Sequence, residues 1–175
     1  MPIKTIFLDR DGVINKEVNY LYKIEDFEFI DGVFDAFLYF QGLGYEIIIV
    51  TNQSGIYRRY YSVADYQILT AWMLNQFENK GIKILDIFYC PHGPNSTCKC
   101  RKPKPGMLLE AAIKHNIDLN NSWMIGDKEV DMEAARKAGI PNTILVRSGH
   151  IIDELNSEAI FFLDSIQQSK QVITN

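Results

Sequence analysis

The 175-residue sequence predicts an α/β fold built as a doubly wound, mostly parallel sheet. Two observations predict it. Short β-branched and apolar runs alternate with longer segments whose apolar residues recur every three to four positions, as in amphipathic helices. One run, residues 46–50, contains four consecutive apolar residues, which is typical of a strand buried on both faces of a parallel sheet. Alternation over the whole chain then favours right-handed crossovers with helices on both faces.

Capping and turn residues divide the first half of this pattern. Residues 5–8 form a short β-branched strand that ends in a carboxylate. Asp31 is expected to cap the next helix and Gly42 to end it, because aspartate favours N-caps and glycine favours helix ends. After the buried strand, Ser62 followed three residues later by Asp65 has nearly the pattern of a capping box, and it predicts a second helix.

The second half continues the alternation. Residues 84–89 are the third predicted strand, and Pro105 suits the first turn of a helix, where its missing N–H is not needed. Gly139 would end a later helix. The remaining predicted elements are a strand at 123–125, a helix at 130–138, a strand at 143–146, and an edge strand at 160–163 before a C-terminal helix.

Composition and charge exclude several function classes. Lys and Arg number 18 against 22 Asp and Glu, so a net charge of −4 gives no electrostatic footprint for nucleic acid. The apolar runs are too short to span a bilayer, and Asp9 interrupts the only N-terminal one, which argues against a signal peptide. We expect one domain over residues 1–175, a monomer in the cytoplasm that binds neither nucleic acid nor membranes.

All three cysteines lie within eleven residues, together with a histidine. An odd number in one cluster argues against a disulfide scaffold. A Cys₃His set is typical of a closed, structural zinc site; a cluster of buried reduced thiols is the alternative. The predicted zinc loop spans residues 90–102, and its ligands would be Cys90, His92, Cys98 and Cys100.

Polar residues follow the predicted strands at the sheet edge where such folds bind ligands. Asp9 and Asp11 follow the first strand, Thr51 the second and Asp127 the fourth, while the third leads towards Lys102. Paired acids, a hydroxyl and a cation fit phosphoryl transfer. A polar turn or a glycosidase carboxylate pair are alternatives that would explain Asp9 and Asp11 alone. Neither explains the polar and charged residues that follow the other strands.

Phosphoryl transfer gives each of these residues a role. Asp9 would attack phosphorus and form an aspartyl phosphate, and Asp11 would protonate the leaving alkoxide and then activate water. Thr51 would donate a hydrogen bond to the phosphoryl group, and Lys102 would neutralise its charge. A carboxylate meets a phosphate dianion only if a cation screens the repulsion. Magnesium would do so, held by Asp9, Asp11 and Asp127.

These motifs resemble those of the haloacid dehalogenase superfamily. The resemblance covers residues 9–131 and is carried by Phe-Leu-Asp-Arg-Asp-Gly, Thr-Asn-Gln, Lys102 and Gly-Asp-Lys-Glu-Val-Asp, in that order. The Cys/His loop resembles the zinc-containing branch, which includes D-glycero-D-manno-heptose 1,7-bisphosphate 7-phosphatases and histidinol-phosphate phosphatases. Residues 51–56 and 101–107 are more similar to the heptose enzymes. The resemblance implies a Rossmann-like haloacid dehalogenase fold. The roughly 40 residues between the first two motifs already contain a helix and a strand, so they are too few for a separate cap domain.

What the resemblance implies about function is a magnesium-dependent phosphatase that removes the C7 phosphate of heptose 1,7-bisphosphate in ADP-heptose and lipopolysaccharide biosynthesis. Two alternatives stay open. Only five residues separate His92 from Cys98, as in the histidinol-phosphate phosphatases, so that substrate is the first. A non-enzymatic zinc-loop binding module is the second, although every catalytic position is filled.

The resemblance also implies contacts to the sugar and its second phosphate. Residues 17–20 lie where the similar enzymes contact sugar hydroxyls, and Arg101 is expected to reach past the reacting phosphate. His115 and His150 are expected to be ordinary surface or helix-end residues. The predicted substrate-binding residues are Glu17, Asn19, Tyr20, Asn52, Gln53, Ser54, Arg58, Arg101 and Lys128.

Overall fold

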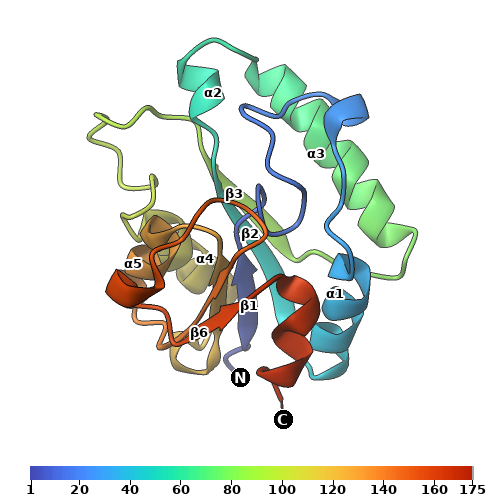
Figure 1. Ribbon diagram of the computed structural model, residues 1–175, viewed down its shortest axis with the longest axis vertical. Helices are drawn as coiled ribbons and strands as arrows, with labels where there is room; N and C mark the ends of the chain where they lie inside the picture. The colour runs from blue at the N-terminus through green and yellow to red at the C-terminus, as the bar shows by residue number, and fades with distance from the viewer. Residues whose placement is uncertain (175) are drawn as a thin grey trace.

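A six-stranded sheet forms the centre of the computed structural model, which describes residues 1–174 (Figure 1). All neighbouring strands pair in parallel, in the order β3-β2-β1-β4-β5-β6. The strand order reverses between β1 and β4, which makes the carboxyl ends of these two strands the expected ligand site. The strands are β1 (Thr5–Leu8), β2 (Glu46–Asn52), β3 (Asp86–Cys90), β4 (Trp123–Gly126), β5 (Asn142–Val146) and β6 (Phe161–Leu163).

Helices cover both faces of the sheet, and each face has its own hydrophobic core. Alternate side chains of β1 point to opposite faces, so Ile6 and Leu8 join one core and Phe7 the other. The first core also contains residues of α1 and α3, and the second contains residues of α4 and α5. The helices are α1 (Val33–Gly42), α2 (Ser54–Tyr57), α3 (Val63–Glu78), α4 (Gly106–His115) and α5 (Glu129–Ala138).

The predicted doubly wound, mostly parallel sheet is confirmed, and all six predicted strands are present in it. The capping box at the start of α3 is present, since Ser62 accepts a hydrogen bond from the Asp65 N–H and the Asp65 carboxylate accepts one from the Ser62 N–H. Gly139 ends α5 in the left-handed conformation. Along residues 1–174, no separate cap domain interrupts the connection from β1 to β2, which contains a short 3₁₀ turn and α1.

Some local predictions were wrong. Asp31 does not cap α1: the N-cap is Gly32, at a φ of +82°, and the helix starts one residue later. A Cβ atom at Gly32 would lie 2.7 Å from Gln167 Cγ, so the glycine allows both the left-handed backbone and the close packing of the C-terminal segment. That segment contains the predicted C-terminal helix, which is a 3₁₀ helix over Ile166–Gln171. The third strand runs from Asp86 to Cys90 and so reaches the first predicted zinc ligand.

Within residues 1–174, no helix combines the length and the apolar character that crossing a membrane requires.

Candidate active site

The carboxyl ends of β1, β2 and β4 bring the predicted catalytic side chains together. Asp9 follows β1, Thr51 lies near the end of β2 and Asp127 follows β4. All three are buried, and Asp127 is completely inaccessible to solvent. The parallel register explains their proximity, since the Asp9 N–H donates to the carbonyl of Ile125 in β4 at 3.0 Å.

Lys102 forms the cationic centre of this cluster. Its ammonium lies 3.0 Å from Asp9 Oδ1 and 2.7 Å from Asp131 Oδ1, and it donates to the Val50 carbonyl at 2.8 Å. Burial opposes the charged form, but the Asp131 and Asp9 carboxylates outweigh it and raise the pKa of Lys102 above its ordinary value. The lysine therefore stays charged at neutral pH.

Asp9 presents its two oxygens to different surroundings. Oδ1 accepts from the Arg10 N–H at 2.8 Å and contacts the Lys102 ammonium. Within residues 1–174, no hydrogen-bond donor is recorded for Oδ2, which leaves that oxygen available to a ligand. Burial raises the pKa of Asp9 to about 6, against the opposing effect of Lys102 and with the support of neighbouring carboxylates.

The two oxygens of Asp127 also differ, since one accepts hydrogen bonds and the other does not. Oδ2 accepts from the backbone N–H of His150 at 3.1 Å and from its ring Nδ1 at 2.6 Å, assigned here as Nδ1–H. Oδ1 is buried, and no hydrogen-bond partner for it lies in the described part of the chain. Burial, followed by the charge of Asp9, raises the pKa of Asp127 to about 7. A buried, unpartnered carboxylate oxygen is the kind of ligand that a hard divalent cation requires.

One ligand atom from each of Asp9, Asp127 and Asp131 lies within 4.8 Å of the others, which fits a shared cation. Asp131 is already occupied, because Oδ1 pairs with Lys102 and Oδ2 accepts from the N–H groups of Asp127 and Lys128 at 3.2 and 3.1 Å. It therefore orients Lys102 and closes the first turn of α5. Asp9 and Asp127 retain the free oxygens.

Asp11 is placed differently from the other acids. Its carboxylate accepts from Arg10 Nη2 at 2.9 Å, from Asn15 Nδ2 at 3.0 Å and from Gln53 Nε2 at 3.2 Å. It faces the cavity described below, and it is not among the three acids grouped around a shared cation. The sequence reasoning missed Arg10, which is only 2% exposed, and no local pattern marked it.

Thr51 and Gln53 are held as a unit. Gln53 Nε2 donates to Thr51 Oγ1 at 2.8 Å, and its carbonyl oxygen accepts from the Tyr61 hydroxyl. Burial raises the pKa of Tyr61 to about 12, so this hydroxyl remains a donor at neutral pH. These contacts fix the Thr51 hydroxyl at the end of β2 and hold the Gln53 amide as a donor to Asp11.

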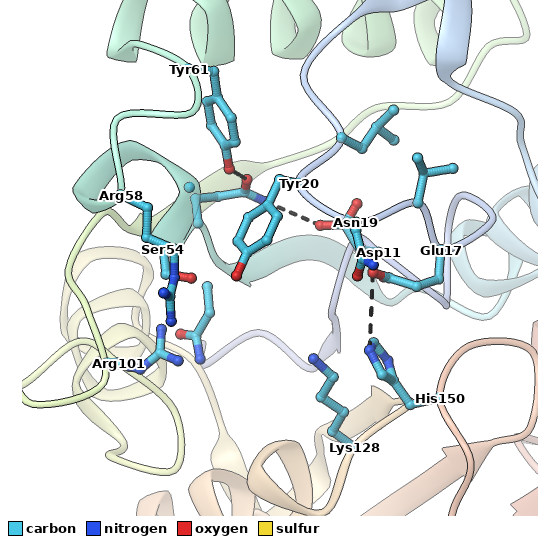
Figure 2. A pocket seen from close by; sticks show the side chains of 15 residues that line it. Asp11, Glu17, Asn19, Tyr20, Ser54, Arg58, Tyr61, Arg101, Lys128 and His150 are labelled. Carbon is cyan, nitrogen blue, oxygen red and sulfur yellow. Dashed lines mark hydrogen bonds and ion pairs between the residues drawn. The ribbon is translucent and has the colours of Figure 1, made fainter.

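All nine residues predicted to contact substrate line one cavity of about 250 Å³, which Figure 2 shows. Arg58, Arg101 and Lys128 project into it, and among residues 1–174 none of these cations has an ion-pair partner. The Arg58 guanidinium lies 5.9 Å from the centre of the Tyr20 ring. Asp11 and these three cations therefore line the same cavity.

His150 also lines this cavity, and the expectation that it is an ordinary surface residue was wrong. His115, by contrast, lies on α4 and contacts Asp86 at 2.7 Å, at the other end of β3 from the cysteines. The distinction depends on contacts with residues more than twenty positions away, which a sequence pattern does not show.

The four predicted zinc ligands converge beside the cavity. Cys90 Sγ lies 3.8 Å from Cys98 Sγ and 2.9 Å from Cys100 Sγ, and His92 Nδ1 lies 3.4 and 3.3 Å from Cys90 and Cys100. Tetrahedral zinc with sulfur ligands at about 2.3 Å separates two sulfurs by about 3.8 Å. The donor set and most of these separations fit zinc, and the cysteines are not in disulfides.

The loop that carries these ligands also positions Lys102. Asn52, at the end of β2, exchanges two hydrogen bonds of 3.1 Å with the Lys102 backbone. Lys104 donates to the carbonyls of Ser96 and Cys98, and Arg101 donates to the carbonyl of His92. The cluster thus fixes a segment that contributes one cation to the buried centre and another to the cavity.

Comparisons with known proteins agree with this geometry. A HAD-hydrolase-like family model matches residues 99–168. The chain is 52% identical to D-glycero-alpha-D-manno-heptose-1,7-bisphosphate 7-phosphatase of Photorhabdus laumondii, over 90% of each chain. It is 46% identical to the D-glycero-beta-D-manno-heptose enzyme of Vibrio cholerae, over 95% of this chain and 94% of that one.

A solved structure extends the likeness to the fold. D,D-heptose 1,7-bisphosphate phosphatase from B. bronchiseptica, complexed with magnesium and phosphate, superposes with a TM-score of 0.85 at 28% identity and covers 97% of each chain.

Proposed function

The chain belongs to the family of D-glycero-D-manno-heptose-1,7-bisphosphate 7-phosphatases, and from this premise we propose that it removes the C7 phosphate of heptose 1,7-bisphosphate in ADP-heptose biosynthesis. The observation that carries the proposal is a pair of buried carboxylates, each with an oxygen that has no partner among residues 1–174, next to a cavity lined by three cations without ion-pair partners in the same range. The relatives carry heptose names, so they do not support the histidinol-phosphate alternative.

Asp9 is the nucleophile of the proposed mechanism. Its Oδ2, which lacks a donor, attacks phosphorus while Oδ1 stays fixed by Lys102 and the Arg10 N–H. The phosphorus–oxygen bond to the sugar breaks, and an aspartyl phosphate remains. Thr51 donates a hydrogen bond to the transferred group, and Lys102 supplies positive charge. Asp9 and Asp127 would hold magnesium, with Asp11 predicted as a third ligand, and the ion would neutralise charge between carboxylate and phosphate.

Asp11 is the acid and base of the proposed mechanism. Arg10, Asn15 and Gln53 fix its carboxylate at the wall of the cavity, where the leaving oxygen of the sugar would lie. It gives a proton to that oxygen in the first step and takes one from the attacking water in the second. The hydrogen bonds keep one geometry for both transfers.

The three cations of the cavity wall would bind the second phosphate of the substrate. Arg101 and Arg58 have planar guanidinium groups, which bind phosphate with two parallel hydrogen bonds. Lys128 lies on the α5 side of the cavity and would contribute a third positive charge. Glu17, Asn19 and Tyr20 line the same cavity and would contact the sugar.

The Cys/His loop supports this function indirectly. A closed Cys₃His site leaves no open position for chemistry, so zinc there would be structural. Reduced thiols of this kind persist in the cytoplasm, which supports the predicted location. We treat residues 1–175 as one phosphatase domain, because β1 to β6 form a single sheet around one site.

Phosphate release from a panel of substrates tests the proposal. The panel contains both anomers of D-glycero-D-manno-heptose 1,7-bisphosphate, fructose 1,6-bisphosphate and histidinol phosphate, because the relatives differ in anomer. We expect the highest kcat/KM for one heptose anomer. Comparable rates on all four compounds would contradict the assignment.

Arg101→Ala tests the site of the second phosphate. Loss of a charged hydrogen bond, worth about 1.5–3 kcal/mol, should lower kcat/KM for the sugar bisphosphate by roughly one to two decades. Hydrolysis of a small aryl phosphate, which offers nothing at the distal end, should change much less. Arg59→Ala is the matched control, since Arg59 does not line the cavity. Equal losses on both substrates would place Arg101 at the reacting phosphate instead.

A further inference from the structure

The loop between β5 and residue 154 brings His150 to the buried Asp127. Two donors of this one residue, the backbone N–H at 3.1 Å and the ring Nδ1 at 2.6 Å, contact the same oxygen of Asp127. Asp127 is completely buried, and its other oxygen has no partner within residues 1–174. The carboxylate is therefore held from one side only.

The backbone around Asp127 also packs closely on the side of Oδ2. A Cβ atom added at Gly12 or Gly149 would lie 2.3 or 2.1 Å from Asp127 Oδ2. The two glycine backbones thus form a narrow cradle around the oxygen that His150 contacts. Ser148 anchors the same loop without contacting Asp127, because its hydroxyl donates to the Gly12 carbonyl at 2.7 Å.

The contact also determines which nitrogen of His150 bears hydrogen. When Asp127 is ionised, as a ligand of a cation is, Nδ1 faces a carboxylate and is assigned as the N–H nitrogen. Nε2 then faces the cavity, 4.0 Å from Glu17 Oε1, and Figure 2 shows the ring pointing towards Glu17 with Lys128 beside it. The Nδ1–H and Nε2 sides of the ring therefore serve different neighbours, and a substitution can remove one without the other.

We propose that His150 is a positioning residue for the divalent cation: its Nδ1–H holds Asp127 Oδ2 and so presents Oδ1 to the ion. The inference rests on the proposed magnesium-dependent function and adds a residue that the motifs did not contain. Hydrogen bonds to the non-ligating atoms of metal ligands commonly change metal affinity by about 10–100-fold. We expect a change at the lower end of this range of affinities, because the backbone N–H of residue 150 still donates to Asp127 after the side chain is replaced.

Binding of Mn²⁺ to the zinc-loaded full chain without substrate tests this inference, with free Mn²⁺ measured by electron paramagnetic resonance and Mg²⁺ as competitor. We expect His150→Ala to weaken binding by about tenfold. His150→Asn places an amide N–H near the position of Nδ1, so it should bind within about threefold of the original chain. In turnover assays, His150→Ala should raise the Mg²⁺ concentration for half-activation by about the same factor.

Ser148→Ala is the matched control, because it removes another anchor of the same loop without touching Asp127. It should bind Mn²⁺ like the original chain. Equal weakening by Ser148→Ala and His150→Ala would show that loop anchoring matters and not the ring, and unchanged binding by His150→Ala would overturn the inference. Failure of His150→Asn to restore binding would overturn it too. If the original chain binds no Mn²⁺, the proposed magnesium site itself fails, and the role of His150 with it.

Discussion

Single residues at the site carry charges that are buried but balanced. Lys102 is 3% exposed and keeps its charge because two carboxylates and a carbonyl surround the ammonium. Asp9 and Asp127 are less well compensated, and burial raises the pKa of each. An uncompensated buried carboxylate destabilises the folded chain, but it is a strong ligand and nucleophile. Stability is thus lower where the proposed chemistry needs free oxygens.

Asp9→Asn should abolish phosphate release while the chain stays folded. The amide is nearly isosteric and keeps an oxygen for the Arg10 N–H, but it cannot attack phosphorus or carry the charge for magnesium. Lys102 remains paired with Asp131, so no ammonium is left without a partner. Phosphate release, far-UV circular dichroism and the melting temperature measure the outcome.

Asp11→Asn is the comparison variant for this prediction. It should also be severe, but it keeps the nucleophile, so the aspartyl phosphate should accumulate if the leaving group departs unaided, as mass spectrometry of acid-quenched protein would detect. Retention of more than a few per cent of activity by Asp9→Asn would refute a covalent mechanism through this residue.

At the scale of elements, the sequence predicted whatever depends on local patterns. The apolar run in residues 46–50 predicted a central strand, and Ser62 with Asp65 predicted the start of α3. The site residues at strand ends were also predictable, because parallel strands bring their carboxyl ends to one edge. All nine predicted substrate contacts line one cavity for this reason.

Contacts across long sequence distances were not predictable in the same way. Asp31 resembled an N-cap, but the N-cap of α1 is Gly32, whose left-handed backbone lies against Gln167 of the C-terminal segment. His150 carries no motif, and only the return of its loop to Asp127 shows its environment. Single-sequence reasoning therefore recovers the elements and the strand-end residues, whereas residues that act through a second element need the structure.

The loop at residues 90–102 is the element whose stability should depend most on a metal. Cys98→Ser should lower zinc content below one ion per chain, since it removes one of four ligands. Zinc binding at small structural sites contributes on the order of 10 kcal/mol and is coupled to folding, so the loop should loosen. Metal analysis, limited proteolysis within residues 90–102 and the melting temperature check this prediction.

Activity should fall in the same variant because Lys102 and Arg101 lose their fixed backbone. Ser96→Ala is the control, since Ser96 lies in the loop and caps the Cys98 N–H without being a predicted ligand. A well-folded, fully active chain that contains less than one zinc would contradict the structural role of the metal.

At the scale of the whole molecule, the sheet order concentrates negative charge at one point. Segments that lie more than a hundred residues apart in the sequence, after β1 and after β4, place two acids at the strand-order reversal. The net charge of −4 is modest, so the effect is local. Binding of a cation at this point should therefore stabilise the molecule in a way that depends on pH.

The raised pKa values determine whether the stability of the magnesium-free chain rises or falls with pH. Ordinary aspartate has a pKa of 3.8, whereas Asp9 and Asp127 in the folded chain have values of about 6 and about 7. Between pH 4 and 7 the folded chain binds more protons than the unfolded chain, so these two groups lower stability as pH rises in magnesium-free buffer. Magnesium requires both carboxylates ionised, and protons compete with it below pH 7.

The magnesium-dependent rise in melting temperature should therefore grow with pH. At pH 8, a concentration 100-fold above Kd contributes about 2.7 kcal/mol, or roughly 5–10 °C for a chain of this size. At pH 5.5 the two pKa values reduce the affinity by about a hundredfold, and the same concentration should shift the midpoint by about 1 °C. Other titrating groups cancel, because each pH compares the zinc-loaded chain with and without magnesium. Asp9→Asn should lose most of the rise at pH 8, and a rise of equal size at both pH values would show that magnesium binds away from these two carboxylates.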